Sequence, residues 1–221
     1  MCGTVQQDKI AAEKKSIGFD YQFLYFIYVL LGIEPDQKVG YEVKDDVHLE
    51  FEDGNSIYMQ LKHSLGEEKN LTEKDIDLWK TLYNWGVIIS EVSSIIIEQI
   101  SFIKKIKFYM VTNKQNNSNP FFEKVEKIKS MEMTGAKFKT YIETLKNGIK
   151  GDSDHSKKLK KYMSQLLLMD EVVLVTFLSQ LQVEFNFDDV PKKLEKRILT
   201  MFFAIQKCIK VQPIYVESLA T

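Results

Sequence analysis

Residues 39–63 constrain the fold more than any other stretch, because apolar and polar side chains alternate through two short runs. Alternation with a period of two is typical of a β-strand with one covered face. The runs are separated by Asp53-Gly54-Asn55, a turn sequence in which glycine takes a positive φ without steric cost. The apolar positions of the two runs are Val47, Leu49, Phe51, Ile57, Met59 and Leu61. The pattern predicts a β-hairpin with one apolar face.

Polar residues occupy the positions between these apolar ones, and they could form a site on the other face of the hairpin. Gln60 and Lys62 are two apart, so they lie about 6.6 Å apart along a strand and project from the same side, which we expect to be the face away from the core. Asp46 has the parity of that polar face, and Glu42 would join it if the chain turns at residues 44–45. An acid, an amide and a lysine would then converge. The alternative is an ordinary solvated hairpin face, on which His48 is also expected to be exposed.

Four elements in this order resemble a known enzyme superfamily. The segment from Asp46 to Lys62 resembles the D…(E/Q)-x-K signature of PD-(D/E)XK nucleases, in the Q-x-K form of the Mrr-like branch. Nuclease effector domains of bacterial anti-phage systems of the CBASS and Lamassu types carry similar elements. Their counterparts here are Gly-Phe-Asp-Tyr-Gln at 18–22, Glu42 to Asp46, Gln-Leu-Lys-His at 60–63, and Trp-Lys-Thr-Leu-Tyr-Asn-Trp at 79–85. The resemblance weakens after about Asn113.

The resemblance implies the roles of the site residues. Asp46 would be the first metal ligand, and Gln60 would add its side-chain oxygen where relatives have a glutamate. Glu42 and Asp45 are alternatives for a second carboxylate. Mg²⁺, or Mn²⁺ in its place, suits such oxygen donors and keeps several waters. Lys62 would lie beside the attacking water and stabilise the charge that develops on the phosphate.

Substrate binding would need a local basic surface, because the formal net charge is only −1. The densest basic run, here called the 157–161 lysine run, comprises Lys157, Lys158, Lys160 and Lys161. A solvated helix face is the alternative explanation of this run. Lys80 and Asn84 share a helical face that could contact a phosphate. By resemblance, Gln22 takes the place of a metal-binding glutamate and is also a candidate substrate contact, and His63 would help to orient the site.

The rest of the chain predicts an α/β protein. One helix is expected over residues 17–32, and a second from an N-cap at Thr72 to about residue 99. Further helices are expected over 120–130, 136–149, 156–179 and 191–210. Strands are expected over 106–112 and 181–187. The tryptophans at 79 and 85 are expected in the core. Together with the resemblance, this predicts a restriction-endonuclease-like mixed central sheet flanked by helices, with a mostly helical C-terminal part. The expected division is a nuclease core at 1–113 and a helical part at 114–221 that packs on it.

The function expected from these features is metal-dependent DNA endonuclease in anti-phage defence. Double-stranded DNA is the expected substrate, with activation by a sensor or ATPase subunit, or by homo-oligomerisation, since no sensor domain is evident. A catalytically weak binding or scaffold module and an RNA nuclease remain the alternatives. Two cysteines without disulfide or metal spacing fit a cytoplasmic protein, and the longest apolar run, Phe23 to Leu31, is too short to cross a bilayer.

Overall fold

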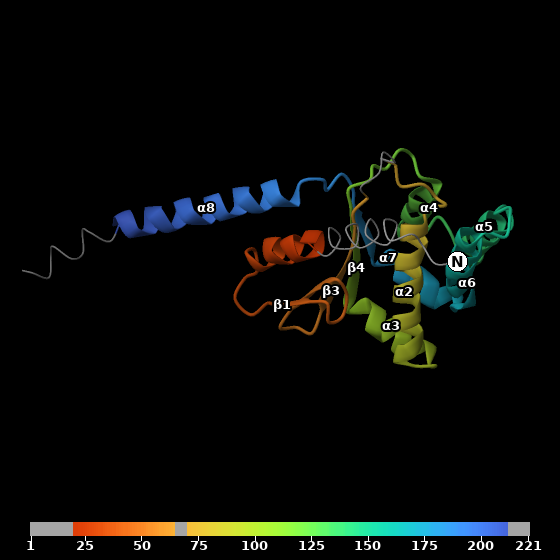
Figure 1. Cartoon of the computed structure of the whole chain (residues 1–221). Helices are drawn as coiled ribbons and strands as arrows, with labels where there is room; N and C mark the ends of the chain where they lie inside the picture. Colours follow the sequence, from red (N-terminus) through yellow and green to blue (C-terminus); the bar gives the residue numbers. More distant parts are fainter. Residues whose placement is uncertain (1–19, 65–69, 212–221) are drawn as a thin grey trace, which may run out of the picture. The chain divides into compact units, whose positions relative to one another are not determined.

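The structure is a computed structural model that describes residues 20–64 and 70–211, without the side chains of 208–211. The chain divides into two compact units (Figure 1). We call residues 36–187 the sheet unit, and residues 1–35 with 188–221 the terminal unit. The sheet unit holds every described strand and the helices α2 to α7, so β5 and the helices after Asn113 share a unit with the hairpin.

A five-stranded mixed sheet forms the centre of the sheet unit. Its spatial order is β1-β2-β3-β4-β5, with β1, β2 and β3 antiparallel and β3, β4 and β5 parallel. The strands are β1 (Lys38–Tyr41), β2 (Val47–Glu50), β3 (Ser56–Lys62), β4 (Ile106–Thr112) and β5 (Leu181–Glu184). The mixed α/β architecture predicted from the sequence is confirmed, including the 106–112 strand.

The hairpin between β2 and β3 turns where the sequence indicated. Gly54 has φ 80°, in the left-handed region that favours glycine. Phe51 N donates to Asn55 O at 3.0 Å and closes the turn. Asp53 accepts a hydrogen bond from Asn55 N at 2.9 Å, so the side chain stabilises the same turn. The connection fixes the antiparallel register in which Val47 lies opposite Met59.

Two helices carry the chain from β3 to the parallel strand β4, as a parallel crossover requires. They are α2 (Ile76–Val92) and α3 (Ile96–Lys104), not the single helix to residue 99 that the apolar periodicity predicted. Ser93 makes the break, since its backbone is extended and its hydroxyl accepts from Ile95 N at 3.0 Å. The predicted N-cap at Thr72 was also wrong. Asp75 is the N-cap, and its carboxylate accepts from Asp77 N at 2.9 Å.

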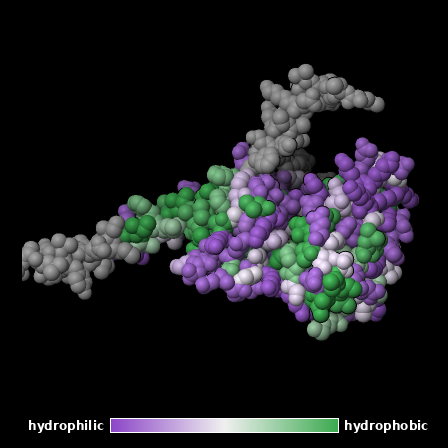
Figure 2. All heavy atoms as spheres, turned by 90° about the horizontal axis from the view of Figure 1, so that it is seen from below, coloured by the Kyte–Doolittle hydropathy of each residue, from purple (hydrophilic) through white to green (hydrophobic). Residues whose placement is uncertain are grey.

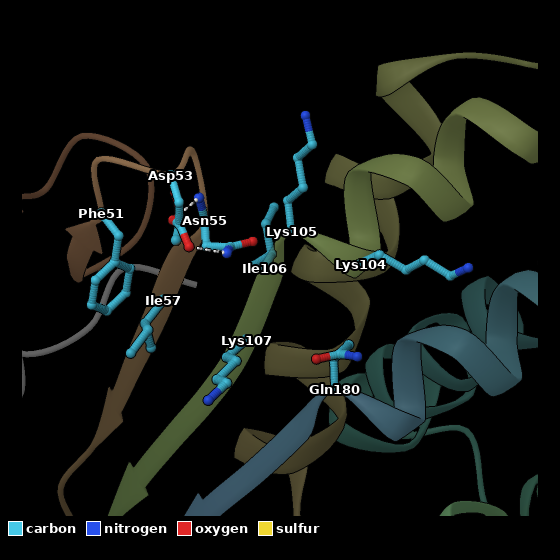
Figure 3. A pocket seen from close by; sticks show the side chains of 10 residues that line it. Phe51, Asp53, Asn55, Ile57, Lys104, Lys105, Ile106, Lys107 and Gln180 are labelled. Atoms are coloured by element: carbon cyan, nitrogen blue, oxygen red, sulfur yellow. Dashed lines mark hydrogen bonds between the residues drawn. The ribbon is translucent and has the colours of Figure 1, made fainter.

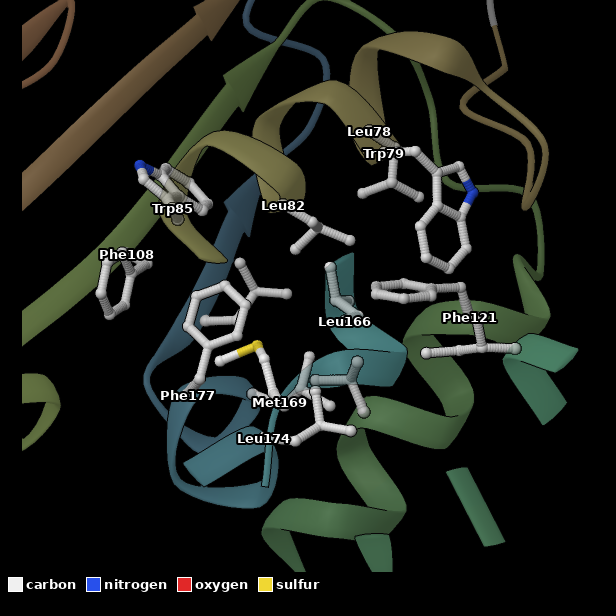
Figure 4. Close-up of a cluster of buried hydrophobic side chains, with 14 of the residues drawn as sticks. Leu78, Trp79, Leu82, Trp85, Phe108, Phe121, Leu166, Met169, Leu174 and Phe177 are labelled. Atoms are coloured by element: carbon white, nitrogen blue, oxygen red, sulfur yellow. The ribbon is translucent and has the colours of Figure 1, made fainter. Parts of the chain in front are cut away.

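Aromatic side chains fill the space between the sheet and its helices (Figure 4). Trp85 on α2 lies 5.3 Å from the ring of Phe108 on β4, and Phe177 on α7 lies 4.9 Å from Phe108. Trp79 packs edge to face against Phe121 at 5.5 Å. Both tryptophans are at most 1% exposed, so their predicted place in the core is confirmed. Figure 1 shows α2 to α7 gathered beside β4.

The face of β3 that packs toward these helices is the one that carries Gln60 and Lys62. Tyr58, Gln60 and Lys62 pair in register with Phe108, Met110 and Thr112 of β4, and Tyr58, Phe108 and Met110 belong to the core cluster. The expectation that this face lies away from the core was therefore wrong. Strands covered on both faces have no exposed polar side, so parity alone does not tell which face meets the helices. His48 is likewise buried, at 6% exposure, and not a surface residue.

The remaining helices of the sheet unit follow β4. They are α4 (Pro120–Lys129), α5 (Gly135–Asn147), α6 (Asp154–Leu168) and α7 (Glu171–Ser179). The segment expected as one helix over 156–179 is divided because Asp170 caps α7 and accepts from Val172 N at 2.8 Å. No single described helix has the length and apolarity of a membrane span. The helices α6 and α7 taken together have that length and apolarity, but the angle between them is 109°.

The terminal unit pairs two helices. A helix over residues 20–30 is the described part of the helix predicted at 17–32, and Gly18 and Phe19 lie outside the described residues. The second helix is α8 (Val190–Val211), which agrees with the predicted 191–210. The guanidinium of Arg197 lies 4.0 Å from the ring of Tyr28 and donates to its carbonyl. Figure 2 shows apolar side chains along α8, and the large exposed ones among its described side chains are Ile198, Leu199, Met201, Phe202, Phe203 and Ile205.

Candidate active site

Asp46 lies at the end of the β1–β2 connection with its carboxylate against β3. One oxygen, Oδ2, accepts from Leu61 N at 2.8 Å and from the Gln60 side-chain amide. The connection itself is closed by Glu42 N, which donates to Asp46 O at 3.0 Å, and Glu42 has φ 56°. The backbone therefore holds Asp46 in place from both sides. The structure brings Asp46 and Gln60 together, as the sequence predicted.

The carboxylate of Asp45 also accepts two hydrogen bonds. Its Oδ2 accepts from the indole Nε1 of Trp85 at 2.6 Å, and its Oδ1 accepts from Asp46 N at 2.9 Å. Burial raises the pKa of Asp45 to about 6, with a smaller contribution from the nearby Asp46 charge, while the Trp85 hydrogen bond opposes the rise. The side chain is thus anchored to the core through α2.

Lys62 ends β3 on the same side, where burial lowers the pKa of its ammonium group. The charges of Asp46, Asp77 and Asp45 oppose this shift, and Lys80 adds to it, so all four side chains are near Lys62. Lys62 nevertheless forms no hydrogen bond or ion pair with another described residue. Lys62 is half-buried, and removing water from an ammonium group that has no hydrogen-bonding partner is costly for stability. Such a group marks a candidate functional residue.

A pocket of about 450 Å³ opens beside these groups. Glu42, Asp45, Asp46 and Gln60 line it from the sheet, and α2 supplies its other wall. Burial and the charge of Asp46 raise the pKa of Glu42. The carboxylates of Glu42 and Asp46 are therefore close enough to repel each other. The α2 residues that line the pocket are Tyr83, Asn84, Trp85, Val87 and Ile88.

The sequence pointed to Asn84 but missed two neighbours of the site. Tyr83 lines the pocket, and Asp77 interacts with Lys62. Both lie on α2 within one turn of Lys80, which is exposed. Their spacing of three from Lys80 would have placed them near the same helix face. Apolar periodicity could not single them out, because both are also ordinary residues of an amphipathic helix.

The donors of this pocket suit a hard cation. Asp46 and Glu42 offer carboxylate oxygens and Gln60 an amide oxygen, the ligand type that Mg²⁺ takes together with several waters. The Gln60 amide points its nitrogen at Asp46, so its oxygen would face a shared cation after a rotation of the amide by half a turn. Within the described residues, no three His, Cys, Asp or Glu side chains are grouped as a metal site. Any cation here would keep much of its water.

The predicted substrate residues fall into three places. Lys161 of the 157–161 lysine run lies over the ring of Tyr83, 5.3 Å from its centre, which links that run to the pocket wall. His63 follows Lys62 at the end of β3 and is half-buried. Gln22 lies on the helix over residues 20–30 of the terminal unit, outside the sheet unit that carries the pocket. Its role therefore stays a prediction.

A second pocket lies near the start of β3 and β4 (Figure 3). Its basic residues, here called the β4-pocket lysines, are Lys104, Lys105 and Lys107. Figure 3 shows their side chains pointing in three different directions, while Asp53 is occupied by hydrogen bonds with Asn55. Diverging charges do not make a common binding site. These lysines therefore provide a matched control for the basic residues of the candidate site.

Comparisons with family models, with curated proteins and with solved structures found no match to this chain.

Proposed function

We propose that the sheet unit is a metal-dependent endonuclease that hydrolyses phosphodiester bonds in DNA. The observation that carries the proposal is Lys62, a half-buried lysine at the end of β3 with a lowered pKa and no ion-pair partner among the described residues, beside the held carboxylate of Asp46. Partial desolvation of an unpaired ammonium group is expected to cost stability, and such strained groups are characteristic of functional sites. The resemblance of the sequence to Q-x-K nucleases supports the same reaction.

Each residue has a chemical task in this proposal. Asp46 and Gln60 would hold the cation, with Glu42 as a further carboxylate. A bound Mg²⁺ ion would neutralise charge on the scissile phosphate. Lys62 would hold the attacking water at its ammonium group and stabilise the charge of the transition state. Its lowered pKa brings it closer to the range in which a lysine exchanges a proton near neutral pH.

The surface beside the pocket would bind the DNA backbone. Asn84 lines the pocket and Lys80 is exposed one turn before it on α2. Lys161 extends the positive charge onto α6 through its contact with Tyr83. Phosphate contacts of this kind position the duplex without reading its sequence. A role in anti-phage defence, a sensor or ATPase partner and homo-oligomerisation are proposed from the sequence resemblance, and a cytoplasmic location from the two cysteines without disulfide spacing.

The decisive experiment measures cleavage of supercoiled plasmid DNA and of structured RNA while Mg²⁺ or Mn²⁺ is titrated. Wild-type protein is compared with Lys62→Ala and Asp46→Ala. We expect each variant to lose roughly 10²-fold or more in rate while remaining folded. Lys107→Ala is the control, because Lys107 is exposed on β4 in the second pocket.

One feature favours a second candidate function, a nuclease-like scaffold that binds without cutting. Gln60 is a neutral amide, and it donates to Asp46 instead of adding a second negative charge beside it. Binding of DNA with no metal-dependent cleavage by wild-type protein would support the scaffold. Cleavage of RNA but not plasmid would move the substrate to RNA and leave the site assignment in place.

A further inference from the structure

Trp85 belongs to the core, yet its one polar atom faces the candidate site. The side chain is 1% exposed and packs against Phe108 and Phe177, with ring centres 5.3 and 6.4 Å away. Its Nε1 donates to Asp45 Oδ2 at 2.6 Å. Because the ring is enclosed by the core, the position of this donor is fixed by packing (Figure 4).

Asp45 connects the fixed indole donor of Trp85 to Asp46. Its second oxygen accepts from Asp46 N at 2.9 Å, and the Asp46 carboxylate in turn meets Leu61 N at 2.8 Å. A continuous series of contacts therefore runs from the core, through the indole and two aspartates, to β3. The connection between β1 and β2 is short and carries Asp46 at its end, so a fixed point at Asp45 removes much of its freedom.

We infer that Trp85 and Asp45 form a positioning pair, which aims the Asp46 carboxylate at Gln60 and Lys62. In this arrangement Asp45 acts through Asp46 and is not itself a ligand of the cation. The inference deepens the proposed function and rests on it. Groups that react must be held to within a fraction of an ångström, and small misplacements lower rates strongly.

The same helix supplies a matched control. Trp79 is also fully buried, packs on Phe121 at 5.5 Å, and donates its Nε1 to Glu73 O at 2.8 Å. Replacing either tryptophan by phenylalanine removes one indole hydrogen bond and part of one ring from the core. Only the Trp85 bond leads to Asp46. The chain has two tryptophans, so each variant keeps a single indole.

The experiment compares Trp85→Phe with Trp79→Phe in the full chain. We expect similar losses of stability in urea unfolding. We expect kcat for plasmid cleavage to fall by about 10-fold or more in Trp85→Phe alone, with KM for DNA unchanged. Asp45→Asn should lower kcat too, and the double variant Asp45→Asn/Trp85→Phe should be little worse than either single variant, because the two residues act as a unit. Equal kcat in the two tryptophan variants would overturn the inference.

A binding measurement separates this inference from the proposed function. In Trp79→Phe, Trp85 is the only tryptophan, and Mn²⁺ binding is followed by quenching of its emission. A positioning Asp45 predicts that Asp45→Asn weakens Mn²⁺ binding only a few-fold, whereas Asp46→Ala abolishes it. Loss of Mn²⁺ binding in Asp45→Asn as complete as in Asp46→Ala would make Asp45 a ligand and overturn the inference. If wild-type protein cleaves neither DNA nor RNA, the proposed function fails, and this Mn²⁺ comparison alone decides whether Asp45 positions Asp46.

Discussion

Replacing Lys62 by methionine should make the sheet unit more stable and inactive at the same time. Burial lowers the pKa of Lys62, which means that the folded state disfavours its charged form. No other described residue compensates that charge with an ion pair or a hydrogen bond. Methionine is apolar, unbranched and flexible, so it fills much of the same space without a charge to desolvate. The variant should gain about 0.5–2 kcal/mol, the usual gain from a single stabilising substitution.

Thermal unfolding followed by circular dichroism measures this gain. For a chain of this size, 1 kcal/mol corresponds to roughly 2–4 °C in Tm. Plasmid cleavage by the same preparation should fall by about 10²-fold or more, and Lys62→Arg should not restore it, because a guanidinium cannot lose its proton and directs its charge differently. Lys107→Met is the control, since Lys107 is exposed and its replacement should change stability by less than about 0.5 kcal/mol.

Two results would contradict a strained catalytic role for Lys62. A Lys62→Met protein that is less stable than wild type by more than about 1 kcal/mol, the size of a typical destabilising substitution, would mean that the ammonium group has a partner that stabilises it. A Lys62→Met protein with wild-type cleavage would remove Lys62 from the reaction. Increased stability together with abolished activity is the outcome that a structural lysine does not produce.

Other substitutions test the packing and the substrate surface. Gly40→Ala should destabilise by about 1–3 kcal/mol in urea unfolding, because its Cβ would overlap the imidazole ring of His48, and the destabilisation should shrink in a His48→Ala background. Lys114→Met should lower the free energy of unfolding in urea by about 3–5 kcal/mol. The reason is that the Lys114 ammonium group lies 2.5 Å from Asp75 Oδ2 and both side chains are only 7% exposed. A loss below about 1 kcal/mol, the usual value for a surface pair, would contradict a buried pair. Changing the 157–161 lysine run to glutamines should reduce the slope of log affinity for DNA against log salt by about 0.9 for each phosphate that is no longer bound, whereas the same change in the β4-pocket lysines should leave the slope unchanged.

The local patterns predicted most of the sheet because strands and turns depend on neighbouring residues. Period-two alternation located β2, β3 and β4, and Gly54 marked the turn between β2 and β3, where its φ is positive. Helix boundaries were harder, because Thr72 and Asp75 are both good N-caps. Asp75 is selected by a distant contact, since its carboxylate also binds Lys114, 39 positions later in the chain. No local pattern contains that information.

In the candidate site, too, local sequence patterns predicted only part of the structure. Parity correctly placed Gln60 and Lys62 on one side of β3, since period two requires it, but which side meets the helices depends on what covers the sheet. The difference matters for the chemistry. On a solvated face, Lys62 would keep an ordinary pKa and contribute little, whereas under α2 its ammonium group loses water and its interaction with Asp46 gains strength. The contact between Trp85 and Asp45 spans 40 positions, and it forms because the same helix that desolvates Lys62 also carries the indole. The placement of α2 therefore determines both the electrostatics and the geometry of the candidate site.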